Sequence, residues 1–420
     1  MVGVPRLESA GGPDPDPVER DGPDAQPPWD LIALLGLAFI VLGWMALAVS
    51  YNPSHGAQGA FERFHTVTLE QFQTLPWREF LHQMHTTYGP VFYALVGSLH
   101  LPLQGVRAVG LVMHLLSTLL IFQVVLGFGM SWTRATMLAA AFFASPFQFG
   151  PALWGHPDAL AMLLMLLGIA VSGLLGGAYR PAAMGLLPLT VVVHQAGVAV
   201  VAASCLDDLR TRRFVACAVK LGATGALLYL LYQVWDGFTP PSVRQTLQFN
   251  TRALLMGFTL LVLGLHAWDR INLRFAWHEL LQRFLALWVV FTVVYGVSAP
   301  FAGGGFIFSR LDALQADWLP LSVLSPALMA AVVAWSWRSL LGYRLATLQI
   351  LVCATMLATG DTLYLKDVDF FFWPLLLMRL VRWGRQRPGI GTALLHSAVC
   401  WTLVSLTLAT LSYGVVTGLL

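Results

Sequence analysis

The sequence predicts an all-α, polytopic integral membrane protein with about thirteen transmembrane helices and a large amphipathic first extracytoplasmic loop. Two observations predict this class. Hydrophobic residues make up 57% of the 420 residues and charged residues only 11%, a composition that is not typical of soluble proteins. The apolar residues also gather in runs, most of which are long enough to cross the ~30 Å hydrocarbon core of a bilayer as helices.

The chain begins with a segment, residues 1–29, that is rich in proline and acidic residues and poor in large apolar side chains. Such a segment cannot bury enough surface to offset its conformational entropy, so we expect a disordered cytoplasmic tail. The apolar run 30–50 follows, and its long acidic flank differs from the short basic flank of a signal peptide. We expect this run to remain as the first transmembrane helix of one membrane domain, 30–420.

The first loop, residues 51–105, mixes polar and aromatic residues. Apolar residues recur at helical spacing over 62–72, which indicates an amphipathic helix lying on the membrane. Pro76 ends this helix, and a second short helix is expected over 77–85. Gly89-Pro90 then turns the chain back towards the bilayer.

The remaining apolar runs set the topology. With a cytoplasmic N-terminus, most of the 24 Lys and Arg residues fall on the cytoplasmic side, as the positive-inside rule requires. Two runs, 180–194 and 196–207, are short, and merging them into one helix would invert everything that follows. The runs after the first loop are 106–127, 135–153, 158–177, 180–194, 196–207, 213–234, 253–268, 283–299, 318–337, 343–360, 369–383 and 391–418.

Charge and cysteine content exclude other classes. The net charge is +3 without a basic tract, so nucleic acid is not an expected partner. The four cysteines lie in or beside apolar runs without a C-x-x-C pair, which indicates small packing residues and neither a disulfide framework nor a zinc site. His82 and His85 share a helical face near Glu79, but histidines at a wet interface are ordinarily only amphipathic, so a divalent metal is possible without being favoured.

Carboxylates on the expected outer side are the first candidates for chemistry. Glu62, near the start of the interfacial helix, could act as a general base towards a hydroxyl group while a lipid-borne donor arrives from the side; the alternative is a solvated or capping residue. Asp158 directly precedes an apolar run, where charge is costly unless it faces a cavity. Its alternative role is to cap that helix.

Polar residues at other span ends are the next candidates. His194 and Gln195 separate the two short runs and should form the tip of a shallow hairpin, either as helix-to-helix hydrogen bonds or as site residues. Arg310, after three glycines, and Lys366 could bind a phosphate at headgroup level or anchor lipid headgroups.

Four short motifs resemble one enzyme family. Glu62-Arg63-Phe64-His65 and the later 84–90, Met-His-Thr-Thr-Tyr-Gly-Pro, resemble the first luminal loop of the eukaryotic dolichyl-phosphate-glucose α-1,2-glucosyltransferases, with its Asp-Glu-x-Phe-His and Ile-Thr-Thr-x-Pro-Gly. His156-Pro157-Asp158 is similar to the segment where GT-C enzymes carry an aspartate after the third span. His194-Gln195 stands where that family has Arg-Gln-Thr, and 364–380 is similar to its Glu-Pro-Arg-Tyr segment.

The resemblance implies that the chain is a membrane glycosyltransferase of the GT-C superfamily. Such an enzyme moves a sugar from a polyprenyl phosphate to a hydroxyl of a glycolipid, polysaccharide or protein, with inversion, on the extracytoplasmic side. For this chain we expect a bacterial-type plasma membrane. No cofactor is implied beyond the lipid-linked donor. Two departures stand out: Phe61 replaces the first acidic residue, and 303–310 stands where the family has Asn-Arg-His. The implied catalytic residues are Glu62 and Asp158, and the implied substrate-binding residues are His65, His156, His194, Gln195, Arg310, Lys366 and Asp369.

Physical chemistry is compatible with that reaction. A sugar on a phosphate already has a good leaving group, so one base and one cation suffice, and no second carboxylic acid is required. The alternative class is a secondary transporter of a small polar solute. Transporters typically place ionisable residues near the midplane and are often built from two related halves. Here the charges gather at one membrane face and no internal repeat is evident, which favours the enzyme.

Overall fold

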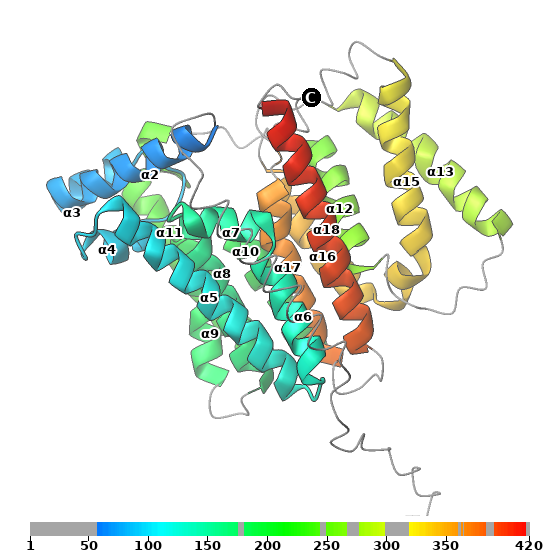
Figure 1. Cartoon of the computed structure of the whole chain (residues 1–420), viewed down its shortest axis with the longest axis horizontal. Helices are drawn as coiled ribbons and strands as arrows, with labels where there is room; N and C mark the ends of the chain where they lie inside the picture. The colour runs from blue at the N-terminus through cyan, green and yellow to red at the C-terminus, as the bar shows by residue number, and fades with distance from the viewer. Residues whose placement is uncertain are drawn as a thin grey trace, which may run out of the picture.

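The computed structural model describes residues 57–174, 180–243, 249–266, 277–298, 319–359, 363, 365–383 and 390–416. All regular structure in these ranges is helical, which confirms the all-α class (Figure 1). The expected tail 1–29 and first span 30–50 lie outside the described residues.

The first loop contains three helices, and the other helices follow the apolar runs. The 3-10 helices η2, Thr190–Val192, and η3, Pro241–Val243, are single turns. The α-helices are α2 Ala57–Thr74, α3 Trp77–Gln83, α4 Val91–Gly97, α5 Leu103–Gly127, α6 Trp132–Phe143, α7 Pro146–Leu153, α8 Pro157–Leu174, α9 Arg180–Leu189, α10 Gly197–Arg210, α11 Phe214–Trp235, α12 Thr251–Leu265, α13 Trp277–Val297, α15 Leu319–Gly342, α16 Arg344–Leu357, α17 Leu365–Trp383 and α18 Ile390–Val416.

Five helices are long and apolar enough to cross a membrane: α5, α11, α13, α15 and α18. The expected thirteen spans are therefore matched only in part. The run 135–153 divides into α6 and α7 because Pro146 occupies the first turn of α7 and disfavours helical backbone at the residue before it. The pair 180–194 and 196–207 gives the short helices α9 and α10, with η2 and a turn between them.

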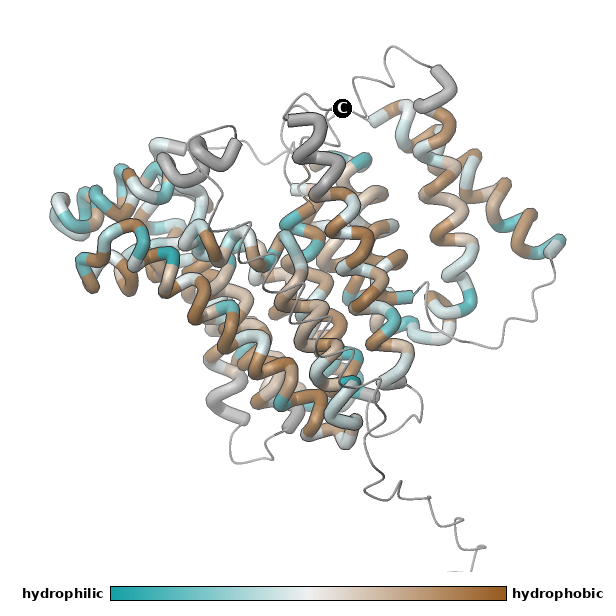
Figure 2. Tube along the Cα trace, viewed as in Figure 1, coloured by the Kyte–Doolittle hydropathy of each residue, from teal (hydrophilic) through white to brown (hydrophobic). Residues whose placement is uncertain are grey.

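Many apolar side chains on the outer helices are exposed within the described part of the chain. The most apolar window of α13 is 11% buried, and that of α11 is 22% buried. Val215 and Val293 are examples of their exposed large side chains. Figure 2 shows apolar residues along the long helices and more hydrophilic residues in α2 and α3. Exposed apolar surface on this scale is typical of contact with lipid.

The first loop packs as a helical layer against α8 and α11 (Figure 1). The expected interfacial helix over 62–72 forms part of α2, and α3 corresponds to the second expected helix. α2 turns polar side chains towards the protein: His65 and Thr68 are buried, whereas Phe64 is exposed. Trp235, at the end of α11, donates a hydrogen bond of 2.8 Å from its ring nitrogen to the Leu81 carbonyl and so holds α3 in place.

The turn after the loop helices docks on η2. The Gly89 N–H donates to the Val193 carbonyl at 3.0 Å. A Cβ atom at Gly89 would lie 1.9 Å from the Val192 carbonyl oxygen, so only glycine permits this approach. At the second close approach, Gly155 has a φ of +68° and lies against Val106 of α5. These two glycines position the residues next to them, Tyr88 and His156.

Candidate functional site

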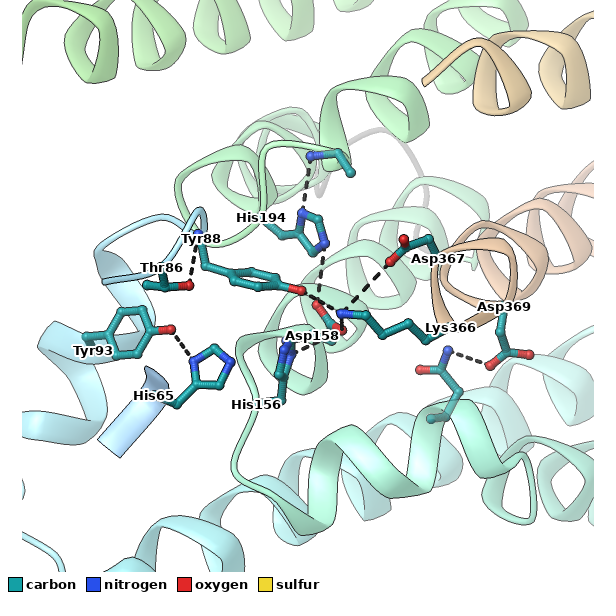
Figure 3. A network of polar contacts seen from close by, with 12 residues as sticks. His65, Thr86, Tyr88, Tyr93, His156, Asp158, His194, Lys366, Asp367 and Asp369 are labelled. Carbon is teal, nitrogen blue, oxygen red and sulfur yellow. Dashed lines mark hydrogen bonds and ion pairs between the residues drawn. The ribbon is translucent and has the colours of Figure 1, made fainter. Parts of the chain in front are cut away.

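Side chains from six separate segments meet in one buried group, which we call the polar cluster (Figure 3). α2 and α4 contribute one residue each, the turn 84–90 another, the start of α8 two, the turn after η2 one, and the start of α17 one. The polar cluster consists of His65, Tyr88, Tyr93, His156, Asp158, His194 and Lys366. Five of these seven were predicted as site residues from the sequence.

Asp158 lies at the centre of the polar cluster and is only 6% exposed. Its Oδ2 atom is 3.1 Å from Nδ1 of His156 and 3.6 Å from Nζ of Lys366. Its Oδ1 atom is 3.4 Å from Nε2 of His194. Asp158 is the second residue of α8, after Pro157, so it is not the N-cap of that helix. Its backbone N–H instead donates to Nδ1 of His156 at 3.2 Å.

The cluster gathers at the N-termini of α8, α10 and α17. Helix N-termini carry partial positive charge and favour anions. This field stabilises the Asp158 carboxylate and opposes the Lys366 ammonium in the first turn of α17. Lys366 is held there by a hydrogen bond of 2.8 Å to the Tyr88 hydroxyl, by Asp158, and by Asp367 Oδ1 at 3.9 Å.

Aromatic rings enclose the charged pair. The Tyr88 ring lies 4.6 Å from both the His156 ring and the His194 ring, measured between centroids. The centroids of the His65 and His156 rings are 4.5 Å apart, and Nδ1 of His65 is 2.5 Å from the Tyr93 hydroxyl. The cluster is therefore a continuous set of contacts from α2 to α17.

Burial keeps the three histidines neutral. Desolvation is the largest cause of the shift at each, and it lowers the pKa of His65 and His156 below 6.5 and that of His194 to about 4. The negative charge of Asp158 raises the pKa of His194, but this effect is smaller than the combined lowering by burial and by the positive charge of Lys366. The Ala196 N–H donates to Nδ1 of His194 at 3.2 Å, so the proton of the neutral ring is on Nε2, beside Asp158.

Acid should destabilise the fold through these histidines. Because the folded pKa of His194 is depressed to about 4 from 6.5, its contribution is fully present above pH 6.5 and is lost as the pH falls towards 4. Between pH 7 and pH 5, His194 alone should lower the free energy of unfolding by about 2 kcal/mol. We expect the thermal midpoint of wild type in detergent to fall more steeply over this range than that of His194→Asn. Equal pH slopes in the two proteins would contradict this reading.

Four other residues that the sequence predicted for the site are not members of the polar cluster. Gln195 is half-buried beside His194, and its Nε2 atom is buried without a hydrogen-bond partner among the described residues. Asp369 is fully buried in a different network. Arg310 lies outside the described residues. Glu62 is in α2, one turn before His65, but the structure does not describe its side chain.

Tyr88 and Tyr93 are the cluster residues that sequence reasoning missed. Tyr88 stands in the motif that carried the family resemblance, and its position directly before Gly89-Pro90 is a signal that could have found it. Tyr93 lies in a short apolar helix, and nothing in its spacing separates it from a core residue. No three His, Cys, Asp or Glu side chains in the described parts of the chain are arranged to hold a metal ion.

The comparisons with known proteins give no match: no family model, no curated protein and no solved structure is significantly similar to this chain. The resemblance to the GT-C enzymes rests on the short motifs alone. It stays a hypothesis, and the geometry of the polar cluster is the basis on which a function can be argued.

Proposed function

We propose that this chain is a membrane glycosyltransferase that moves a sugar from a polyprenyl-phosphate donor to a hydroxyl acceptor on the extracytoplasmic side, with inversion. One observation carries the proposal. A carboxylate and an ammonium, Asp158 and Lys366, lie 3.6 Å apart where the N-termini of α8, α10 and α17 converge under the first-loop helices. This arrangement suits the binding of an anion at the end of a helix bundle.

Lys366 is the group that binds the donor phosphate. A phosphate oxygen that approaches Nζ replaces Asp158 as the counter-charge, and the helix N-termini add to the attraction. As the bond between the anomeric carbon and the phosphate oxygen breaks, negative charge grows on the leaving phosphate. The ammonium stabilises that charge in a site from which most water is excluded.

Asp158 and Gln195 orient the acceptor. Neither Oδ1 of Asp158 nor Nε2 of Gln195 has a hydrogen-bond partner within the described part of the chain, and both atoms are buried. One accepts and the other donates, so together they suit a sugar hydroxyl, which does both. The neutral His194, 3.4 Å from Oδ1, adds a second donor beside the same carboxylate.

Glu62 is the proposed base. It precedes His65 by three residues in α2, and residues at this spacing share a helix face. His65 belongs to the polar cluster, and this spacing is the basis on which we propose Glu62 as the base. The acceptor hydroxyl gives its proton to the Glu62 carboxylate, its oxygen attacks the anomeric carbon, and the phosphate leaves with the bonding electron pair.

Two glutamates on α2 provide the test. In proteoliposomes supplied with a polyprenyl-phosphate sugar that wild type uses, Glu62→Gln should reduce the transfer rate by about 100-fold or more, because the base is lost. Glu70→Gln is the matched control, since Glu70 is exposed on the same helix, and it should retain the wild-type rate. Equal rates in both variants would move the base to another residue.

A further inference from the structure

The carboxylate of Asp369 is buried one turn deeper in α17 than Lys366. Its side chain is fully shielded, with 0% exposure. An ionisable group in such a place is costly unless hydrogen bonds satisfy it. Oδ2 accepts from Ser145 Oγ at 3.0 Å and from Gln148 Nε2 at 2.7 Å. Oδ1 accepts from the ring nitrogens of Trp373 and Trp401, at 3.2 and 2.5 Å.

These four donors come from three helices. Ser145 and Gln148 lie at the start of α7, Trp373 is one turn further along α17, and Trp401 is in α18. Hydrogen bonds to a charged acceptor are stronger than those between neutral groups. The carboxylate has an acceptor site for each donor, so the network is closed and contains no site for a substrate.

The network joins the two segments that carry the charged pair of the polar cluster. α7 runs directly into the turn that holds His156, α8 with Asp158 follows at once, and α17 begins at Leu365, the residue before Lys366. We propose that Asp369 is a positioning residue: by tying the start of α17 to α7 and α18, it sets the separation between Lys366 and Asp158. This inference rests on the proposed function for its purpose, but its geometry can be tested without any transfer assay.

The two lysines of the chain, Lys220 and Lys366, make the test selective. Lys220 forms a separate buried pair with Asp208, at 2.7 Å, and Ser204 Oγ is at the same distance. The rate at which a water-soluble amine-reactive ester modifies each lysine can be measured by peptide mass spectrometry in detergent. Asp369→Asn replaces one carboxylate oxygen by an NH2 group, so two of the four donors lose their acceptor. The start of α17 is then held less firmly, and we expect Lys366 to be modified about tenfold faster while the rate at Lys220 stays unchanged.

Asp208→Asn is the matched control, because it makes the same change at the buried carboxylate that pairs with the other lysine. It should speed modification of Lys220 and leave Lys366 unchanged. If Asp369→Asn does not fold, Trp401→Phe serves in its place. It removes one donor and should raise the modification rate of Lys366 by a smaller factor. The proposal is overturned if the modification rate of Lys366 stays at its wild-type value in the Asp369 and Trp401 variants. It is also overturned if the modification rates of both lysines rise by the same factor. Absence of sugar transfer by wild type would overturn the proposed function and leave this result unaffected.

Discussion

Replacement of Asp158 by Asn is expected to reduce sugar transfer by about 100-fold or more while the helices remain folded. The isosteric amide keeps the volume of the side chain but removes the negative charge at the centre of the polar cluster. Lys366 then loses its nearest buried counter-charge, and His194 faces an amide in place of a carboxylate. Because Lys366 is partly exposed and Asp367 stays 3.9 Å away, we expect a stability loss of about 2 kcal/mol, less than for a fully buried pair.

Asp367→Asn separates the role of Asp158 from a general loss of negative charge near Lys366. Asp367 is also close to Nζ, but its side chain is 30% exposed, and exposed charge pairs contribute little. We expect its transfer rate to stay within about threefold of wild type. Initial rates and thermal midpoints measured for both variants decide the matter. A rate for Asp158→Asn close to that of Asp367→Asn would exclude Asp158 from the reaction.

Among the described glycines of the first loop, Gly89 should be the one at which replacement by Ala destabilises the protein most. The new Cβ atom would lie 1.9 Å from the Val192 carbonyl oxygen, and the partner is backbone, which cannot rotate away. Val191 and Val193 are fully buried, so η2 has little room to yield. We expect a loss of about 3 kcal/mol in the free energy of unfolding, at the upper end of overpacking costs, and loss of transfer as Tyr88 moves.

Gly185→Ala in α9 is the control for this substitution. A Cβ atom there meets nothing within 4 Å, and alanine favours helix over glycine by about 1 kcal/mol. Its thermal midpoint should equal or exceed that of wild type. If the Gly89 and Gly185 variants had the same thermal midpoint, the docking of the turn on η2 would not contribute to stability as we argue.

The existence and order of the helices followed from hydrophobic runs, because a long apolar segment must satisfy its backbone hydrogen bonds internally. Their lengths did not. A run such as 135–153 reads as one span, yet Pro146 divides it, and whether a proline kinks or ends a helix depends on what packs around it. The short pair was predicted better: α9 and α10 match the two short runs, and the expected turn at His194 and Gln195 separates them.

Much of the polar cluster was predictable because its members stand at the ends of apolar runs, where polar residues are uncommon without a role. Asp158, His194 and Lys366 are of this kind. Their partners were not predictable: Lys366 and Tyr88 are 278 residues apart, and Tyr93 meets His65 only because α4 folds back on α2. Asp369 stands close to Lys366 in sequence but belongs to another network, because one further helical turn places it among α7 and α18.

The most direct test of the account is a measurement of sugar transfer by the wild-type chain in proteoliposomes. A panel of radiolabelled polyprenyl-phosphate sugars is supplied together with a membrane glycolipid fraction, and labelled product and solute uptake are followed in the same vesicles. The account predicts transfer from at least one donor, with inverted anomeric configuration and without uptake of free solute. Uptake of a small polar solute, without transfer from any donor, would contradict it and establish the transporter instead.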